Sequence, residues 1–268
     1  QQMSNNPICT DYLSTSHIKV KRTHFNEINS TQVYSQTNIK LDSMNTWHLI
    51  SASQQTAGIG SHNRTWVSEN GGLFFTLNLL LPAQTVAEMN KIQLLSILTA
   101  KVVIQSLQHV LKDRQDFKLN LKWPNDVLLN GKKICGSLIQ CQPSTNNPTQ
   151  QMVLIGVGVN VNNSREQLNS VDQKSTSLYI EFDNKYDIEA IQKDIVLGLL
   201  NQIPNTGYKC TFDDELIMYK NELVKVFDDQ KNKYIVGKMM GIDENGFLQL
   251  LTDNEIVTVI SGTLRPNE

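Results

Sequence analysis

Residues 122–136 read KWPNDVLLNGKKICG, and the path of the surrounding chain can be worked out from this stretch. Asn130-Gly131 stands between two apolar runs, and an Asn-Gly pair favours a type I′ turn because both central residues need a positive φ. The stretch therefore predicts a β-hairpin. Lys133 lies on the returning strand, where it can face Asp126, and a buried lysine beside a carboxylate suits charge neutralisation at a phosphate. A surface hairpin with solvated lysines would fit the same spacing.

Helix and strand patterns surround this hairpin. A capping-box pattern at residues 85–88 begins the clearest helix, and apolar residues then recur at helical spacing as far as about Lys112. A second amphipathic helix begins near Asp187, a suitable N-cap, and a third, short helix is expected over 213–221. Strand-like apolar runs cover residues 47–53, 73–81, 119–123 and 152–161. These patterns predict one large unit that contains both helices and strands.

The pattern changes after about residue 222. Short β-rich pieces follow, separated by turn-forming residues such as Asn245-Gly246. These pieces cover residues 223–227, 233–240, 247–251 and 255–260. We therefore expect a first domain over residues 1–221 and a small all-β barrel over residues 222–268.

The composition is that of an ordinary globular protein, with 40% hydrophobic and 19% charged residues. A net charge of −2 gives no electrostatic reason to expect nucleic-acid or membrane binding. No apolar run approaches the roughly 20 residues of a membrane helix, and the N-terminal residues do not resemble a secretory signal. The four cysteines have neither CxxC nor disulfide-framework spacing, which is typical of reduced thiols. These features predict a cytoplasmic protein.

A glycine-bearing loop, QTAGIGSHNRTW at residues 55–66, is a second polar constellation. The backbone N–H groups of such a loop can meet phosphate or carboxylate oxygens. Arg64 would add positive charge, and Trp66 would add a face for stacking. A flexible surface loop is the alternative, because two glycines spaced as GxG are a weak signal by themselves.

Two further elements lie on either side of this loop in the sequence. Ser30 and Thr31 are placed to cap a helix that follows them, and their hydroxyls would equally suit a neutral polar ligand in a dry pocket. The run IGVGVNV at residues 155–161 fits a core strand, in which Gly156 leaves room for a ligand or for another backbone.

The string KWPND, followed by Lys133 and then by Gly136, resembles the central signature of biotin–protein ligases, also named holocarboxylase synthetases. In that family the lysine at the position of Lys133 contacts the biotin carboxylate and the phosphate of the adenylate. The other elements occur here in the family's order. The resemblance implies that Ser30 and Thr31 bind the ureido ring of biotin and that Asn160 contacts the adenylate or ATP.

The glycine loop resembles the family's biotin- and adenylate-covering loop, with departures. Ile59 and Ser61 stand where arginines are usual in many members. The family's residues are kept at Gln55, Gly58, Gly60, Arg64 and Trp66. Backbone contacts survive such replacements but guanidinium contacts do not, so the departures leave open how tightly the loop retains the adenylate and do not bear on the reaction class. Gln32 similarly replaces the usual Asn of the ureido-binding element.

The resemblance also implies a fold and an activity. The fold is α+β, with a mixed β-sheet flanked by helices as in class II aminoacyl-tRNA synthetases, plus a small C-terminal SH3-like β-barrel. The activity is that of an enzyme which uses ATP with Mg²⁺ to form biotinyl-5′-adenylate and transfers biotin to a lysine of a biotin carboxyl carrier domain. A lipoate or octanoate protein ligase of the same architecture is one alternative. A non-catalytic module that binds biotin or the acceptor is another.

Residue by residue, the resemblance assigns three sets of positions and no metal ligand. The catalytic positions are Lys133, Arg64 and Asp126. The biotin-binding positions are Ser30, Thr31, Gln32, Gln55, Gly58, Ile59, Gly60, Ser61, Lys133, Gly136 and Gly156. The ATP- or adenylate-binding positions are Arg64, Trp66, Asn125, Asp126, Lys133 and Asn160.

Some ligases of this family double as repressors through an N-terminal winged helix-turn-helix. A domain of that kind needs about 60 residues, and residues 1–20 cannot encode it. We therefore expect no DNA binding. The acceptor protein and the oligomeric state stay open, and a homodimer is compatible with the sequence.

Overall fold

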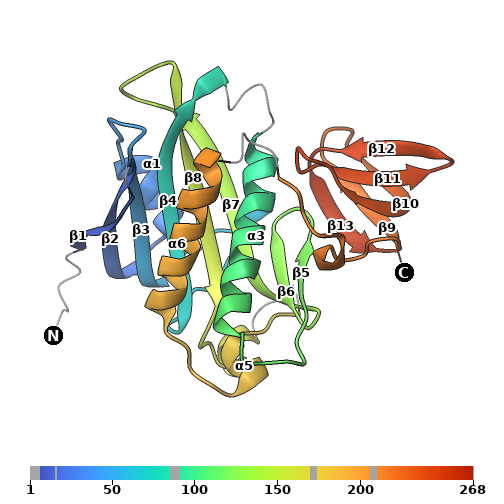
Figure 1. Cartoon of the computed structure of the whole chain (residues 1–268), viewed down its shortest axis with the longest axis horizontal. Coiled ribbons are helices and arrows are strands. Elements are labelled where there is room, and N and C mark those ends of the chain that lie inside the picture. The colour runs from blue at the N-terminus through green and yellow to red at the C-terminus, as the bar shows by residue number, and fades with distance from the viewer. Residues whose placement is uncertain (1–6, 16, 85–90, 170–173, 206–209, 268) are drawn as a thin grey trace.

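The computed structural model describes residues 7–15, 17–84, 91–169, 174–205 and 210–267, which form two β-sheets and a layer of helices (Figure 1). The larger sheet contains β1 (Ile8–Ser14), β2 (Lys19–Ile28), β3 (Thr46–Gln55), β4 (Gly72–Pro82), β5 (Leu119–Lys122), β6 (Asp126–Leu129), β7 (Lys132–Pro143) and β8 (Gln150–Asn160). Its strand order is β1-β2-β3-β4-β8-β7-β6-β5, with β2 and β3 parallel and the other neighbours antiparallel. The mixed sheet expected from the family resemblance is confirmed.

The helices divide between the two faces of this sheet. They are α1 (Thr31–Asn38), α3 (Lys91–Val110), α4 (Arg165–Leu168), α5 (Leu178–Phe182) and α6 (Ile188–Asn205), with 3₁₀ turns η1 (Ser61–Asn63) and η2 (Asp214–Leu216). α3 and α6 lie side by side across one face, whereas α1 packs on β3, β4 and β8. The short helix predicted over 213–221 is limited to η2, because the backbone is already extended at Ile217, and Tyr219 and Asn221 beyond it take positive φ angles.

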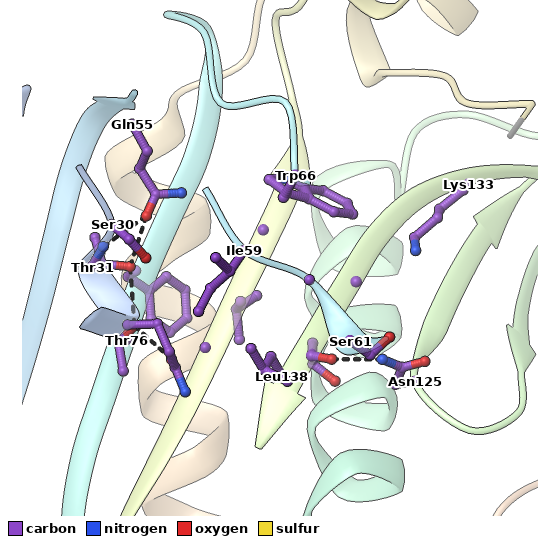
Figure 2. Close-up of a pocket in the computed structure, with 18 residues that line it drawn as sticks. Ser30, Thr31, Gln55, Ile59, Ser61, Trp66, Thr76, Asn125, Lys133 and Leu138 are labelled. Carbon is purple, nitrogen blue, oxygen red and sulfur yellow. Dashed lines mark hydrogen bonds between the residues drawn. The ribbon is translucent and has the colours of Figure 1, made fainter. Parts of the chain in front are cut away.

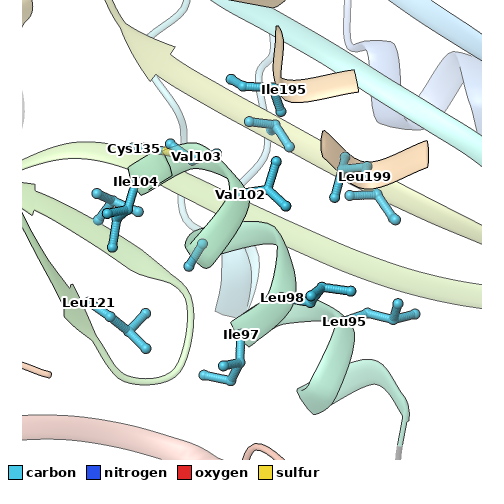
Figure 3. Close-up of a cluster of buried hydrophobic side chains, with 14 of the residues drawn as sticks. Leu95, Ile97, Leu98, Val102, Val103, Ile104, Leu121, Cys135, Ile195 and Leu199 are labelled. Atoms are coloured by element: carbon cyan, nitrogen blue, oxygen red, sulfur yellow. The ribbon is translucent and has the colours of Figure 1, made fainter. Parts of the chain in front are cut away.

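The main core lies beneath α3 and α6. Leu95, Leu98 and Val102 recur on α3 at helical spacing and are buried against the sheet and α6 (Figure 3). The predicted start of α6 is confirmed, since the Asp187 side chain accepts a hydrogen bond from the Ala190 amide. The capping box predicted at 85–88 lies outside the described residues.

The predicted hairpin joins β6 to β7. Asn130 (φ 51°) and Gly131 (φ 76°) both occupy the left-handed region that a type I′ turn requires. The pairing then shifts by one residue, because Val127 pairs with Cys135 whereas Leu128 pairs with Lys133. This β-bulge leaves one extra residue on β7 and turns the side chains that flank it.

The second sheet is all-β, as expected. It contains β9 (Leu223–Asp228), β10 (Lys233–Ile242), β11 (Leu248–Thr252), β12 (Glu255–Val259) and β13 (Gly262–Pro266). The strands pair antiparallel in the order β12-β11-β10-β9-β13. The buried Trp123 indole N–H donates to the Gly246 carbonyl at 3.0 Å and so connects the hairpin region with this sheet. No helix in the described part of the chain combines the length and the apolar character needed to cross a membrane.

Candidate functional site

A pocket with about 470 Å³ of empty space opens on the sheet face that carries α1. Its walls come from the start of α1, from β4, β7 and β8, and from the glycine loop at 55–66 (Figure 2). It is lined by Ser30, Thr31, Gln32, Gln55, Ile59, Gly60, Ser61, Trp66, Phe75, Thr76, Asn125, Lys133, Gly136, Ser137, Leu138, Gly156, Val157 and Gly158. Segments that are far apart in the sequence therefore converge on one cavity.

One end of the pocket is polar but carries no charged side chain. The side-chain oxygen Oε1 of Gln55 accepts from both the backbone N–H and the hydroxyl of Thr31, at 2.8 and 3.2 Å. The buried Thr76 hydroxyl lies 3.0 Å from the Thr31 hydroxyl and 3.0 Å from Gln32 Oε1. Ser30 is the N-cap of α1 and accepts from the Val33 amide, so its predicted capping role is confirmed. This end offers fixed donors and acceptors to a neutral ligand.

The opposite end carries a partly exposed ion pair. Lys133 Nζ lies 2.7 Å from Asp126 Oδ1, with side-chain exposures of 14% and 13%. The same ammonium lies 5.2 Å from the centre of the Trp66 ring, within the range of a cation–π contact. Figure 2 shows Lys133 across the pocket from Gln55, Ser30 and Thr31. The lysine is therefore fixed at the edge of the cavity and is not solvated on a surface hairpin.

The backbone of Lys133 bonds to a segment outside the sheet, residues 174–176. Its N–H donates to the Lys174 carbonyl, and its carbonyl accepts from the Thr176 amide, both at 2.9 Å. The Asn160 side chain in turn donates to the Thr176 carbonyl at 3.0 Å. Asn160, predicted to contact a nucleotide, thus braces the segment that holds Lys133, and it does not line the pocket.

The Trp66 indole packs against β7 and β8 at a place where both strands carry a glycine. Gly136 and Gly158 are direct partners in the pairing of β7 with β8. A Cβ at Gly158 would stand 2.5 Å from the indole nitrogen, and one at Gly136 would stand 2.9 Å from the far edge of the ring. The Trp66 N–H is buried and finds no hydrogen-bond partner within the described residues. In the part of the chain that the structure describes, this indole N–H is therefore unpaired at the wall of the pocket.

Positive charge gathers around the ion pair. Burial lowers the pKa of the Lys122 ammonium, and the charges of Lys133, Arg265 and Arg64 lower it further, while Asp126 opposes the shift. Arg265 comes from β13, so the second sheet contributes to this electrostatic field. Arg64 is exposed, and its guanidinium donates to the backbone and hydroxyl oxygens of Ser61, both at 3.2 Å. This region would attract an anion.

Most of the predicted positions meet in the pocket. Those that line it are Ser30, Thr31, Gln32, Gln55, Ile59, Gly60, Ser61, Trp66, Asn125, Lys133, Gly136 and Gly156. Asp126 does not line the pocket but forms an ion pair with Lys133, which does. Gly58 and Arg64 also lie outside the lining. At Gly58 a Cβ would stand 2.5 Å from both Ser68 Oγ and the Trp66 carbonyl oxygen, so this glycine allows the loop to close on itself.

The sequence analysis missed several lining residues. They are Phe75, Thr76, Ser137, Leu138, Val157 and Gly158. Thr76 had a detectable signal, because it is a polar residue inside the apolar run of β4 and is fully buried. The other residues belong to strands whose apolar pattern does not distinguish a pocket wall from the core.

Comparison with known proteins gives two family matches. The biotin/lipoate A/B protein ligase family matches residues 24–160, and the biotin protein ligase C-terminal domain matches residues 222–263. The biotin protein ligase from Aquifex aeolicus in complex with biotin and ATP superposes with a TM-score of 0.72 at 26% identity, covering 92% of this chain and 99% of that one.

Two curated relatives match over shorter shares of their own length. The bifunctional ligase/repressor BirA of Bacillus subtilis (strain 168) is 27% identical over 221 residues, which are 81% of this chain and 65% of the relative. The biotin–[acetyl-CoA-carboxylase] ligase of Paracoccus denitrificans is 36% identical over 110 residues, 41% of this chain and 42% of that protein. The chain thus spans just under two thirds of the length of the first relative.

Proposed function

This chain belongs to the biotin/lipoate A/B protein ligase family, and from that membership we propose that it is a biotin–protein ligase. It would join biotin to ATP as biotinyl-5′-adenylate and transfer the biotinyl group to a lysine of a biotin carboxyl carrier domain. The Bacillus and Paracoccus relatives are named as ligases, and the Aquifex enzyme is described with biotin and ATP bound.

The pocket's two unlike ends carry this proposal. Biotin has a neutral ureido ring at one end and a carboxylate at the other. The hydroxyls and amides of Thr31, Gln55 and Thr76 match the ring, whose N–H and C=O groups need acceptors and donors. The Lys133 ammonium matches the carboxylate. A lipoyl or octanoyl group has no N–H or C=O to exchange hydrogen bonds with these polar atoms, which disfavours those substrates.

The first chemical step would be attack by a biotin carboxylate oxygen on the α-phosphorus of ATP. A new P–O bond forms, and the bond to pyrophosphate breaks. Two anions must approach each other, so the barrier falls mainly through positioning and charge compensation. Lys133 would lie between the carboxylate and the phosphate, with Asp126 holding its ammonium in place. Lys122, Arg64 and Arg265 would attract the polyphosphate.

In the second step an acceptor lysine amine would attack the biotinyl carbonyl carbon. An amide bond forms as the bond between the carbonyl carbon and the phosphate oxygen breaks, AMP leaves with the electrons of that bond, and the proton of the attacking amine passes to the solvent. Lys133 would stabilise the charge that develops on the departing phosphate, and the Trp66 N–H is a further free donor at the pocket wall. Asp126 is committed to its ion pair, so its proposed role is to orient Lys133.

Magnesium would enter with ATP as part of the substrate. The described residues contain no cluster of three or more His, Cys, Asp or Glu side chains that could hold a resident metal ion. Mg²⁺ in nucleotide sites is commonly bound by phosphates and water with few protein carboxylates, which fits this residue set.

The test is ATP-dependent biotin transfer to a purified carboxyl carrier domain, with pyrophosphate release measured in parallel. We expect labelling by the native chain and loss of both signals in Lys133→Ala. Lys132→Ala is the matched control, because the neighbouring Lys132 pairs with Glu181 at 2.8 Å outside the pocket. Lipoate would be assayed beside biotin. Preferred use of lipoate, or biotin binding without pyrophosphate release, would refute the proposal in favour of a lipoate-type ligase or a non-catalytic module.

A further inference from the structure

A chain of carboxamides leads away from the pocket's neutral end. Gln32 Nε2 donates to Gln140 Oε1 at 2.7 Å, and Gln36 Nε2 donates to the same oxygen at 2.9 Å. Gln140 lies on β7 two residues beyond Leu138, so it points to the same face of the strand as that pocket-lining residue. Gln140 itself does not line the pocket. It can therefore reach a ligand only by acting through Gln32.

The side-chain carboxamide of Gln32 is buried and tightly packed. The residue is 3% exposed, and its Oε1 lies 3.0 Å from the Thr76 hydroxyl. A Cβ at Gly156 would stand only 2.5 Å from that oxygen, so the carboxamide fills the space above a bare glycine in the pocket wall. The carbonyl end of Gln32 thus lies against Thr76 and Gly156, which both line the pocket, while its NH₂ end faces Gln140.

Packing alone cannot select this orientation. The oxygen and nitrogen ends of a carboxamide have nearly the same size and shape, so hydrogen-bond partners decide which end points where. Gln140 Oε1 accepts two N–H donors, one from Gln32 and one from Gln36. An acceptor at this position holds the Gln32 NH₂ group on the β7 side and leaves its carbonyl oxygen on the pocket side.

We propose that Gln140 is a positioning residue that determines specificity. It fixes the Gln32 carbonyl oxygen toward the pocket, where that oxygen accepts a hydrogen bond from an N–H of a cyclic urea. This inference rests on the proposed function, because it takes the pocket to receive the ureido ring of biotin. With the amide reversed, an NH₂ group would oppose the ring N–H, and two buried donors would share no acceptor.

The chain offers a matched set of variants. Gln140→Met keeps the length of the side chain but removes the acceptor. Gln140→Glu keeps an acceptor and, when ionised, can only accept, so it should preserve the orientation of Gln32. Gln142→Met is the control, because Gln142 lies on the same face of β7 and donates to the Gln36 backbone oxygen at 3.2 Å. It braces the same helix through a contact that does not involve the Gln32 side chain.

Calorimetry with biotin and with desthiobiotin, which keeps the cyclic urea, measures the effect. We expect Gln140→Met to weaken both ligands about tenfold, the cost of leaving a buried donor pair unsatisfied. Gln140→Glu and Gln142→Met should bind within about twofold of the native chain, a difference below the cost of one lost hydrogen bond. In turnover, Gln140→Met should raise the KM for biotin with kcat and the KM for ATP unchanged. Melting temperatures confirm folding, and Gln140→Lys, which can only donate, replaces the Met variant if that one does not fold.

The outcomes separate the two hypotheses. The inference is supported if Gln140→Met binds biotin and desthiobiotin weakly while Gln140→Glu keeps the native affinity. Equal weakening by Gln140→Met and Gln142→Met, or native affinity in Gln140→Met, overturns it while the native chain's own biotin binding leaves the proposed function intact. Failure of the native chain to bind biotin would instead remove the proposed function, and this inference with it.

Discussion

Lys133 and Gly136 lie on the same side of β7 although they are three positions apart along one strand. A Cβ at Gly136 would stand 3.2 Å from Lys133 Cε. Residues with that separation point to opposite faces of a regular strand. The bulge between the Val127–Cys135 and Leu128–Lys133 pairs removes the conflict by adding one residue to β7. The Lys133 ammonium therefore lies in the same site as the glycine floor, the name used here for Gly136 and Gly158 beneath the Trp66 ring.

The contact between Trp66 and its glycine floor predicts that the two glycines differ in sensitivity. Gly158→Ala would place a methyl group 2.5 Å from the rigid indole, which cannot yield locally. Overpacking of this kind costs about 1–3 kcal/mol, so we expect kcat/KM for ATP to fall about tenfold or more. Gly136→Ala meets the ring edge at 2.9 Å and the flexible end of Lys133, and its loss should be smaller. Steady-state pyrophosphate release compares the two, and equal losses would contradict the described seat of Trp66.

Asn160 is expected to act through the backbone that supports Lys133. Asn160→Leu would leave the Thr176 carbonyl without its donor and should lower the free energy of unfolding by about 1–3 kcal/mol in urea denaturation. The rate of adenylate formation should fall at the same time, because Thr176 holds the Lys133 carbonyl. A raised KM for ATP with unchanged stability would instead point to direct nucleotide contact by Asn160.

The lowered pKa of Lys122 predicts that the stability of the folded protein depends on pH. Burial and the neighbouring cations hold its pKa in the folded chain below the ordinary value of 10.5. Between those two pKa values the unfolded chain binds more protons, so the native protein gains stability from this group as pH rises. Lys122→Met should therefore raise the melting temperature most near neutral pH, with a gain that shrinks toward pH 10.5. Lys118→Met, at an exposed lysine beside the same strand, is the control. A gain that grows with pH would contradict this account.

The glycine loop lacks a cation at Ser61, which lines the pocket rim. Ser61→Arg would add a guanidinium beside the proposed adenylate site, and a charge-assisted hydrogen bond of about 1.5–3 kcal/mol would slow release of biotinyl-adenylate about tenfold or more. The measurement is dissociation of labelled adenylate after a chase with unlabelled biotin. Thr65→Arg adds the same charge at an exposed position of the loop and should change the rate less. Unchanged or faster release in Ser61→Arg would show that the loop does not close over the ligand.

Elements governed by local chemistry could be predicted directly. The Asn130-Gly131 turn needs positive φ at both residues, and Asp187 caps a helix only three residues from the amide that it binds. The sequence is compatible with either a short tail or a strand over residues 1–20, and it does not separate β1 from β2. Their apolar alternation is weak, and β1 and β2 form by pairing with each other and with β3. Such pairing depends on partners distant in the sequence, which a local pattern does not contain.

The residues of the site also fall into two groups, those that a local sequence motif identifies and those that depend on distant partners. The family-like strings named most of the residues that line the pocket, since a motif records residue types and spacing. They did not indicate that Asn160 would support Thr176, or that Gln140 would hold Gln32, because those contacts join β8 to residue 176 and β7 to α1. Thr76 stands out as a polar residue in the mostly apolar β4, but its contacts with Thr31 and Gln32 on α1 exist only in the folded chain.

The sequence by itself determined the chemical inventory of this protein: the hairpin, the lysine with its carboxylate, the glycine loop and the change to an all-β segment near residue 222. Only the tertiary structure decided which side chain faces which. The alternation of a strand specifies two faces but not which face is buried, and one bulged residue in β7 reverses the assignment beyond it. Lys133 lines the pocket and is not a solvated surface lysine, because strand pairing, and not spacing alone, places it against Asp126 and Trp66.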